Sequence, residues 1–510
     1  MGGPPPGRYS VDGMSSQSDS SAANRGPAKA AESQLDDRTK RRAFAVCVAV
    51  AALTILDLSK VNVGLPSIEE SLGAGPTELQ SIVAGYALAF GLALVPSGRI
   101  GDIVSRRTMF LIGVSLFTLT SLGCALAPNT TLLLVFRFLQ GIAAGIQMPQ
   151  VLGMLQQLFQ GAARARAFGT FGATIGLSTA FGPTIGGLLI FLGGEENGWR
   201  LLFWMNIPLG VLLLFFAARL LPKPPDGPRA EVHLDPVGIL LLAGTILTLM
   251  LPFLLTTGGP TDDPRRWFFL VGAVVFGASF VVWERSYSAR GKTPVVRFAL
   301  FSLGSYRNGI LISTAYFAAL PATFLLTTLY LQQGLGLQAV FAGMVTIPFA
   351  LVSAVAASIG GRLVQTRGRS LVVAGLAFVM VGFVLAVLAA VLSPPELTPW
   401  LMAGALGVAG LGGGFVISPN QTLTLAEVPV SEGGVAGSMG QLGQRIGTAI
   451  GVAGASSTFF STLYSESGGS GPGLSAYHDS YRNGLLVALS LIAVALILGL
   501  VDMRQRAAKD

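Results

Sequence analysis

The stretch GRIGDIVSRR, residues 98–107, joins two long apolar blocks and returns in altered form as GRLVQTRGR at residues 361–369. Both copies place a polar residue, a small residue and a final arginine at the same distances after Gly-Arg. A second pair, GIAAGIQMPQ at 141–150 and GLGGGFVISPN at 410–420, is similar apart from one inserted residue. We therefore expect two related halves, and duplicated helical bundles with a site between the halves are typical of secondary transporters.

Apolar blocks surround these motifs along the chain. A helix of about 20 residues crosses the hydrocarbon layer of a membrane, so each block predicts one transmembrane helix. The chain is 52% hydrophobic and 11% charged, whereas a soluble domain is about 25% charged. Its 66 glycines suit helices that pack closely in lipid. The fourteen blocks are 43–67, 79–98, 108–127, 131–156, 166–191, 201–221, 236–256, 267–284, 307–331, 339–361, 370–392, 399–424, 434–460 and 482–502.

Lysines and arginines gather at alternate connections between the blocks, beginning with Arg106 and Arg107. The opposite connections are acidic, as in the GGEENG turn at 193–198, and arginines there, such as Arg200, adjoin block ends where they can reach the interface. The bias predicts a multi-pass protein of the cell membrane with both termini cytoplasmic. The net charge of +8 then needs no nucleic-acid partner.

The ends of the chain and its reactive side chains narrow the function further. Residues 1–42 are rich in Gly, Pro, Ser and Ala and are expected to form a disordered cytoplasmic tail. Two cysteines and two histidines, at the edges of or inside apolar blocks, indicate no disulfide framework, metal site or cofactor. An enzyme is disfavoured because embedded acids and histidines are too few for a catalytic constellation. A channel is also disfavoured, because it would need rings of like charge or a filter of backbone carbonyls, and neither is apparent in the sequence.

One acidic residue, Asp57 in ILDLSKVNVGLP at 55–66, lies well inside an apolar block. Desolvation favours the neutral form of a carboxyl group, which makes Asp57 the first candidate for carrying a proton. Lys60, one helical turn later, would instead favour the ionised form. Three hypotheses stay open: a structural ion pair, a proton-coupling site in which Lys60 responds to protonation of Asp57, and a substrate site in which Lys60 binds an anionic group.

Buried polar positions continue on the fourth and thirteenth blocks. Arg137, Gln140 and Gln147 recur at helical spacing on about one face, which we expect to line a central cavity. Interhelical hydrogen bonds are the alternative for the glutamines. Gln441 and Arg445 are expected to act similarly.

Two further motifs concern contacts between helices. Asp102 can cap the N-terminus of a helix from the other half and pair with Arg106, forming a latch; a charged orientation loop is the alternative. Gln365 occupies the corresponding place in the second copy, so the latch should be asymmetric. In the fifth block Gly182 and Gly186 permit close contact and Pro183 permits a bend, although plain tight packing would also explain them.

Together these segments resemble the major facilitator superfamily, and within it the fourteen-span drug:proton antiporter family. The resemblance covers nearly the whole chain after the tail. Lys60, where the family usually has an apolar residue, Ser105, where it usually has Gly, and the order Gln444-Arg445 depart from its pattern. The matching segments are LDLSKVNVGLPSI (56–68), GRIGDIVSRR (98–107), RFLQG (137–141), GPTIGG (182–187), WRLLFWMNIPLG (199–210), HLDPVGILLL (233–242), LYLQQGLG (329–336) and QRIGTAIG (444–451).

The resemblance implies an all-α polytopic fold of about fourteen helices in two pseudo-symmetric six-helix halves plus a two-helix insert. We expect halves at 43–221 and 301–503, the insert with its loops at 222–300, and a second cytoplasmic tail at 504–510. The implied activity is proton antiport that exports small apolar or amphipathic compounds, such as drugs and antibiotics, by alternating access. The alternative is an exporter of a lipid or anionic metabolite with weak or no proton coupling.

The implied partners are a small-molecule substrate, protons and the lipid bilayer, with the protein a monomer. The expected site residues are Asp57 and Arg137 for proton coupling; Lys60, Asn62, Gln140, Gln147, Gln441 and Arg445 for the substrate cavity; Gly98, Asp102, Arg106 and Arg107 for the latch; and Gly182, Pro183, Gly186 and Gly187 for the helix bend.

Overall fold

The computed structural model describes residues 2–3, 36–223, 235–256, 262–466 and 472–507, and regular structure in these ranges is entirely helical. Fourteen of the described helices are long and apolar enough to cross a membrane. The predicted all-α polytopic fold is therefore confirmed. Residues 1 and 4–35, which make up most of the first predicted tail, residues 508–510 of the second tail, and residues 224–234 and 257–261 of the predicted insert lie outside the described ranges.

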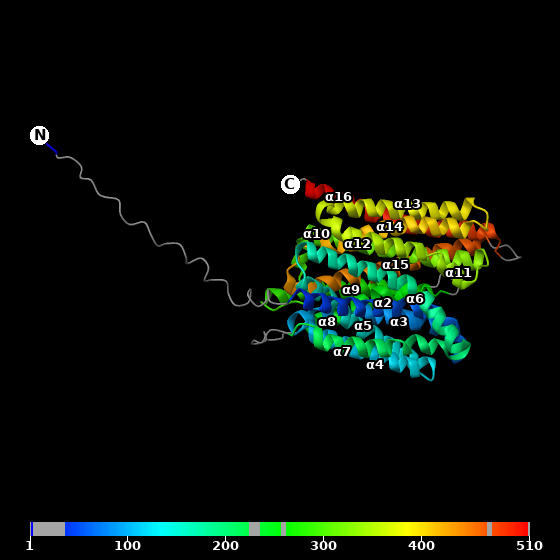
Figure 1. Cartoon of the computed structure of the whole chain (residues 1–510), viewed down its shortest axis with the longest axis horizontal. Helices are drawn as coiled ribbons and strands as arrows, with labels where there is room; N and C mark the ends of the chain where they lie inside the picture. The colour runs from blue at the N-terminus through cyan, green and yellow to red at the C-terminus, as the bar shows by residue number, and fades with distance from the viewer. Residues whose placement is uncertain (1, 4–35, 224–234, 257–261, 467–471, 508–510) are drawn as a thin grey trace. The chain divides into compact units, whose positions relative to one another are not determined.

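The first half of the chain forms six spans (Figure 1). The fifth and sixth spans share α6, because the helix is interrupted only at Gly194, where φ is 80° and ψ is 165°. This left-handed conformation favours glycine, and it lies within the predicted GGEENG turn. The helices are α2 (Asp37–Leu72), α3 (Pro76–Ile103), α4 (Arg106–Leu126), α5 (Thr130–Leu158), α6 (Gly161–Trp204) and α7 (Asn206–Leu220).

The remaining chain forms eight spans, some extended by short helices. The longer helices are α8 (Pro236–Leu254), α9 (Phe269–Ala289), α10 (Gly304–Leu329), α12 (Ile347–Arg367), α13 (Arg369–Leu392), α14 (Thr398–Thr424), α15 (Gly433–Glu466) and α16 (Leu474–Ala507). The short elements are η1 (Pro264–Phe268), η2 (Phe298–Ser302), η3 (Tyr330–Gly334), α11 (Ala339–Met344) and η4 (Val430–Glu432).

Two helix ends differ from the expected boundaries. α2 begins at Asp37, inside the segment predicted as a disordered tail, and α16 continues to Ala507, inside the second predicted tail. The residues concerned are mainly Lys, Arg, Gln and Ala, which are good helix formers, so a helix can continue past its apolar block. Apolar length predicts where a helix crosses a membrane and not where it ends.

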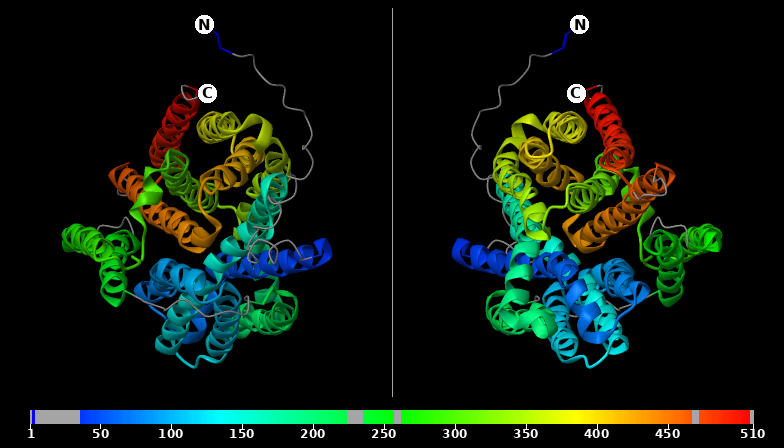
Figure 2. Two further views of the ribbon diagram at one scale, coloured as in Figure 1. Left: turned by 90° about the vertical axis from the view of Figure 1, so that its left-hand side faces the viewer. Right: turned by 90° about the vertical axis from the view of Figure 1, so that its right-hand side faces the viewer.

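Hydrophobic side chains form separate cores in the two bundles. One buried cluster is drawn from residues 312–495 and includes Tyr316, Phe383 and Phe459. Another is drawn from residues 61–203 and includes Trp199 and Phe203. The end-on views show α8 and α9 together on one flank, and α8 contacts both α3 and α15 (Figure 2). The domain boundaries at 221 and 301 stay a prediction.

The two bundles meet along two seams, α3 with α15 and α6 with α12. Glycines let the backbones approach there. A Cβ atom added at Gly98 of α3 would lie 2.8 Å from the carbonyl oxygen of Gly434 in α15, and one added at Gly169 of α6 would lie 3.0 Å from that of Ala357 in α12. Any larger side chain at these positions would push the helices apart.

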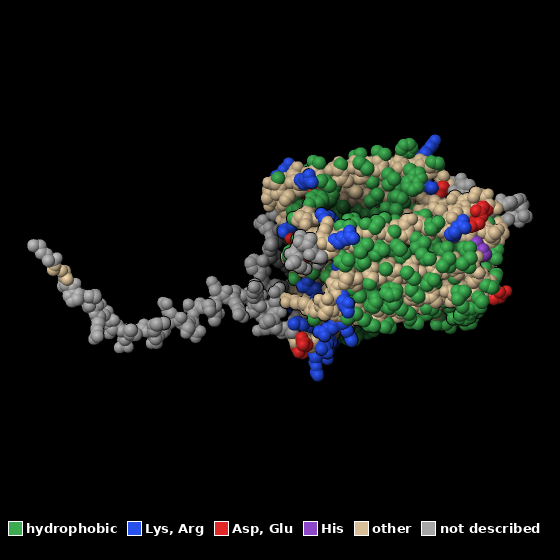
Figure 3. Space-filling model, turned by 90° about the horizontal axis from the view of Figure 1, so that it is seen from above, with side chains coloured by type: hydrophobic (Ala, Val, Ile, Leu, Met, Phe, Trp, Pro, Cys, Tyr) green, Lys and Arg blue, Asp and Glu red, His purple; other side chains and the backbone are tan. Residues whose placement is uncertain are grey.

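The sides of the bundle carry large exposed apolar side chains, among them Phe191 and Trp400. One face is largely apolar between its ends, and lysines and arginines gather at the left end, where α16 finishes in Figure 1 (Figure 3). An apolar belt of this kind must be covered by lipid. The protein is therefore a multi-pass membrane protein.

Candidate functional site

A cluster of charged side chains is sealed between α2, α5 and α7. Asp57 accepts hydrogen bonds from Arg137 Nη1 at 2.9 Å and from Asn206 Nδ2 at 2.6 Å. Lys60 Nζ lies 3.5 Å from the same carboxylate and donates to Asn206 Oδ1 at 2.6 Å. These four side chains, which we call the charge cluster, are at most 1% exposed.

A second layer of hydrogen bonds surrounds the charge cluster. Arg137 Nη1 also donates to Gln140 Oε1 at 2.7 Å, and Gln140 Nε2 donates to Ser121 Oγ of α4 at 2.7 Å. Asn206 Nδ2 lies 3.2 Å from the same Ser121 hydroxyl and closes the network. Asn206 and Ser121 were not predicted as site residues from the sequence. An asparagine within the apolar run WMNIPLG was the available signal for Asn206.

The charge cluster contains two cations and one carboxylate. When Asp57 is ionised, Arg137 and Lys60 share its charge; when Asp57 is protonated, two buried cations face each other with no carboxylate between them. Breaking a buried ion pair in this way is strongly destabilising, typically by 3–5 kcal/mol. Without the charge of Asp57, Arg137 and Lys60 would therefore stay buried with no carboxylate partner in the cluster.

Among the described residues, the polar contacts of Lys60 all lie within the charge cluster. Its ammonium is fully buried between Asp57 and Asn206. This geometry suits an ion pair that is either structural or involved in coupling, and it leaves no access for a substrate in this conformation.

The predicted bend segment of α6 packs directly on the α2 residues next to Asp57. A Cβ atom at Gly186 would lie 2.9 Å from the Lys60 carbonyl oxygen, and Gly182 faces Ser59. Pro183 lies within the helix, and Gly187 has open space around it. Gly182 and Gly186 therefore permit the close approach of α6 to the charge cluster, whereas Gly187 does not contribute to it.

The predicted polar stripe of α5 is occupied by interhelical hydrogen bonds. Gln147 Nε2 donates to Thr54 Oγ1 of α2 at 2.6 Å, and Gln140 bonds Ser121. Both glutamines are at most 1% exposed. In this conformation they follow the alternative that the sequence left open. Asn62, by contrast, is exposed and lies about 200° around α2 from Lys60.

Arg445 belongs to α15, and its side chain reaches across the seam to α3 of the first bundle. Its guanidinium carbon is 4.4 Å from the centre of the Phe90 ring, and Phe90 packs edge to face on Tyr86. Arg137 covers Tyr86 at 4.2 Å. The two rings of α3 therefore separate Arg137 from Arg445. Gln441, one helical turn before Arg445, is 8% exposed.

Asp102 closes the same seam at the end of α3. Its two carboxylate oxygens accept hydrogen bonds from the backbone N–H groups of Gly434 at 3.1 Å and Val435 at 2.9 Å, at the start of α15. Arg106 Nη2 bonds Asp102 at 2.7 Å and the Val430 carbonyl at 2.5 Å. We call these contacts the latch. Arg107 instead bonds the Ala218 carbonyl of α7 at 2.5 Å, within the first bundle.

The second copy of the loop motif is arranged differently. Arg369, which corresponds to Arg106, pairs with Asp502 of α16 and bonds Asn420 of α14. Asn308 of α10 donates to Asp502 at 2.7 Å. Gln365 is exposed. This cluster ties together helices of one bundle, whereas the latch joins two bundles. Asp502, which follows the long apolar run of α16, was not predicted as a site residue from the sequence.

Comparison with known protein families identifies the family of this chain. The family whose sequence model matches residues 47–452 is described as Major Facilitator Superfamily. The chain belongs to the major facilitator superfamily. It is accordingly a transporter and not an enzyme. Among the described residues, no group of three or more His, Cys, Asp or Glu side chains could hold a metal ion.

Several members of the superfamily resemble the chain closely. It is 33% identical to the probable actinorhodin transporter of Streptomyces coelicolor over 83% of this chain and 73% of that protein. It is 31% identical to the puromycin resistance protein pur8 of Streptomyces alboniger over 95% of this chain and 96% of that protein. Among solved structures, the human organic anion transporter MFSD10 superposes with a TM-score of 0.62 at 15% identity, covering 89% of this chain and 99% of that one. That likeness shows the superfamily fold alone.

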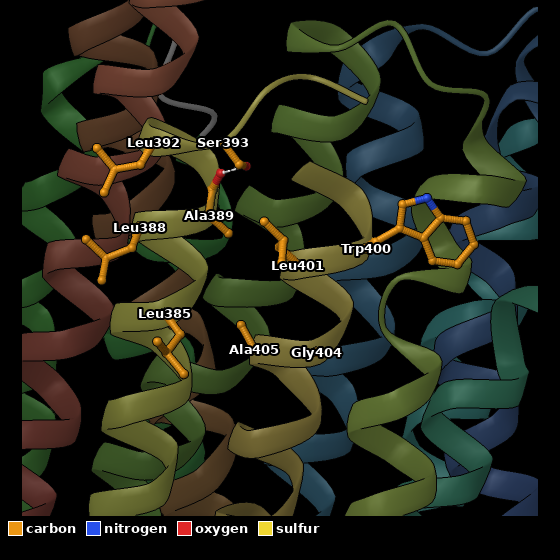
Figure 4. A pocket seen from close by; sticks show the side chains of 9 residues that line it. All are labelled: Leu385, Leu388, Ala389, Leu392, Ser393, Trp400, Leu401, Gly404 and Ala405. Carbon is orange, nitrogen blue, oxygen red and sulfur yellow. Dashed lines mark hydrogen bonds between the residues drawn. The ribbon is translucent and has the colours of Figure 1, made fainter. Parts of the chain in front are cut away.

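An apolar groove lies elsewhere, between α13 and α14 (Figure 4). It has a volume of about 540 Å³ and includes Leu385, Leu388, Trp400 and Leu401. These four side chains are 40% to 78% exposed on the side of the bundle. Since it has no charged side chain and faces lipid, we do not assign the superfamily's transport site to it.

Proposed function

We propose that the protein exports small apolar or amphipathic compounds across the cell membrane by proton antiport. Its membership of a transporter family and its likeness to antibiotic exporters support export of small molecules. The observation that carries proton coupling is the charge cluster, in which a single buried carboxylate holds two cations. A proton that neutralises Asp57 would release both.

The proposed coupling step uses atoms that are already in contact. A proton binds an Asp57 oxygen, and the attraction of Arg137 and Lys60 to that carboxylate falls. The two cations then repel each other in a medium of low dielectric constant, which favours an arrangement that opens the cluster to water. Loss of the proton on the other side of the membrane restores the ion pairs. Asp57 is thus the proton carrier, and Arg137 and Lys60 sense its charge.

The latch supplies the proposed alternating step. Asp102 and Arg106 hold the start of α15 while the seam is closed, and they must release it when the bundles rock. We propose that this end of the bundle is cytoplasmic, because basic side chains gather there. The chain would then be closed to the cytoplasm in this conformation and work as a monomer with both termini cytoplasmic.

Transport by purified protein in lipid vesicles tests this proposal. An imposed proton gradient should drive uptake of an amphipathic dye into inside-out vesicles, and Asp57→Asn should abolish uphill transport while protein remains folded in the membrane. Asp479→Asn, which changes a part-exposed acid near an end of α16, is the matched control. Uphill transport retained by Asp57→Asn would exclude Asp57 as the carrier.

The second candidate function is export of a lipid or anionic metabolite with weak or no proton coupling. The excess of cations in the charge cluster favours a negatively charged substrate. Transport that proceeds only down the substrate's own gradient, and is unchanged by a proton gradient, would select this alternative.

A further inference from the structure

We propose that the substrates are organic anions with an aromatic core, and that Arg445, seated on Phe90 between the two bundles, binds their negative charge. This inference rests on the proposed export function and names its substrate class.

Charge balance in the interior of the bundle is the first argument. Among the described residues, four charged side chains lie in the interior away from the helix ends, namely Asp57, Lys60, Arg137 and Arg445. Three are cations and one is an acid. A charge at membrane depth is costly unless it is paired. The interior therefore lacks negative charge, and a bound anion would supply it whereas a cationic substrate would be repelled.

The second argument distinguishes the three cations. Lys60 and Arg137 are both held by Asp57 and are at most 1% exposed. Arg445 is part-buried, and within the described ranges no carboxylate lies at ion-pair distance from it. Its one described partner is the Phe90 ring, at 4.4 Å. Arg445 is therefore the least buried of the three cations and the one with no carboxylate partner among the described residues.

The surroundings of Arg445 explain why the anion should be aromatic. A guanidinium is planar, stacks on rings and donates paired hydrogen bonds to carboxylate-like groups. Phe90 and Tyr86 add apolar ring surface next to it, and the buried Tyr86 hydroxyl has no hydrogen-bond partner. A ring system that carries a carboxylate, sulfonate or phenolate would match both features.

The position of Arg445 connects binding with transport. The residue comes from α15, whereas the ring beneath it comes from α3, so the site spans the seam that the latch closes. An anion held there contacts both bundles and would be released when the seam opens.

Two dyes of the same ring system but opposite charge provide the test. Fluorescein is an anion and rhodamine 123 a cation near neutral pH. Binding of each to the purified full chain in nanodiscs is measured by fluorescence anisotropy, without a proton gradient. We expect fluorescein to bind at least ~10-fold more tightly than rhodamine 123. Arg445→Gln should remove this preference, and Arg445→Lys should retain part of it, because lysine keeps the charge but not the planar shape.

Arg290→Gln is the matched control, since Arg290 is an exposed arginine at the end of α9 and should leave both affinities unchanged. A preference for rhodamine 123, or a fluorescein preference unchanged in Arg445→Gln, would overturn the proposal. If Arg445→Gln does not fold, the test is made on the wild-type chain. Fluorescein should protect Arg445 from modification by phenylglyoxal, which is measured by mass spectrometry. Absence of protection would overturn the proposal.

These measurements separate the inference from the function on which it rests. Binding that follows the expected pattern without gradient-driven transport would refute proton antiport and leave the anion site standing. Gradient-driven transport of rhodamine 123 in preference to fluorescein would support proton antiport and refute the anion site.

Discussion

Replacing Asp57 and Lys60 singly and together tests whether the charge cluster acts as one unit. The two charges are 3.5 Å apart and fully buried. At an effective dielectric constant of ~20, their attraction is about 5 kcal/mol before desolvation is subtracted. Arg137, at 2.9 Å on the other carboxylate oxygen, adds a second pair of similar strength. Asp57 therefore takes part in two strong ion pairs, whereas Lys60 takes part in one.

The two single changes should have unequal effects. Lys60→Met leaves Asp57 paired with Arg137 but removes the donor to Asn206 Oδ1, so we expect a loss of about 1–3 kcal/mol in the free energy of unfolding. Asp57→Asn leaves Lys60 and Arg137 buried without a carboxylate, so we expect a larger loss of about 3–5 kcal/mol.

The double variant carries the decisive result. Lys60→Met removes one of the two unpaired cations that Asp57→Asn leaves, so the double variant should be more stable than the sum of the single losses predicts by about 1–3 kcal/mol. The measurement is equilibrium unfolding in mixed micelles with sodium dodecyl sulfate. Single losses that add within about 0.5 kcal/mol would refute the pairing.

A second pair provides the control for this cycle. Asp479 and Arg482 have the same spacing of three residues and form an ion pair at 2.7 Å, but their side chains are 33% and 44% exposed. Because water screens exposed pairs, the same double-variant cycle with Asp479→Asn and Arg482→Met should give a coupling of at most about 1 kcal/mol.

Three further predictions concern the latch, its second copy and the apolar groove. Asp102→Asn removes a charged acceptor from the start of α15 and should increase labelling by N-ethylmaleimide of a cysteine placed at Ser438, which is buried in the seam; unchanged labelling would contradict the latch. Asp502→Asn should lower the free energy of unfolding, read by the same micelle titration, but leave the Ser438 position inaccessible, since its partners lie within one bundle. Trp400→Ala should leave dye transport in vesicles within about twofold of wild type, because the groove between α13 and α14 faces lipid; a loss of transport would place substrate there.

The sequence predicts the fold well because transmembrane helices must be apolar over a fixed length. The fourteen blocks correspond to fourteen described spans, and the GGEENG turn contains the break at Gly194. Helix ends were less predictable, as at Asp37, because polar helix formers can extend a helix beyond the membrane. The pairing of α3 with α15 was also not readable, because it joins segments more than 300 residues apart.

The candidate site was only partly predictable. Asp57 and Arg137 stand out because charges are rare within apolar blocks. Asn206 does not, since an uncharged amide barely changes the hydropathy of its block, and its importance arises from contacts 146 and 149 positions away. The sequence also could not decide whether Gln140 and Gln147 line a cavity or bond neighbouring helices. A polar stripe on a helix fits both arrangements equally well.

The different partners of Arg106 and Arg369 give two similar loops different structural roles. Arg106 and Arg369 hold corresponding places in two similar loops, yet Arg106 bonds the opposite bundle and Arg369 ties together three helices of its own. If both arginines joined the two bundles, separation of the bundles would have to break two such sets of contacts at once. With the crossing contacts made by Arg106 alone of the two arginines, separation of the bundles would break one such set, while the contacts of Arg369 would hold its own helices together.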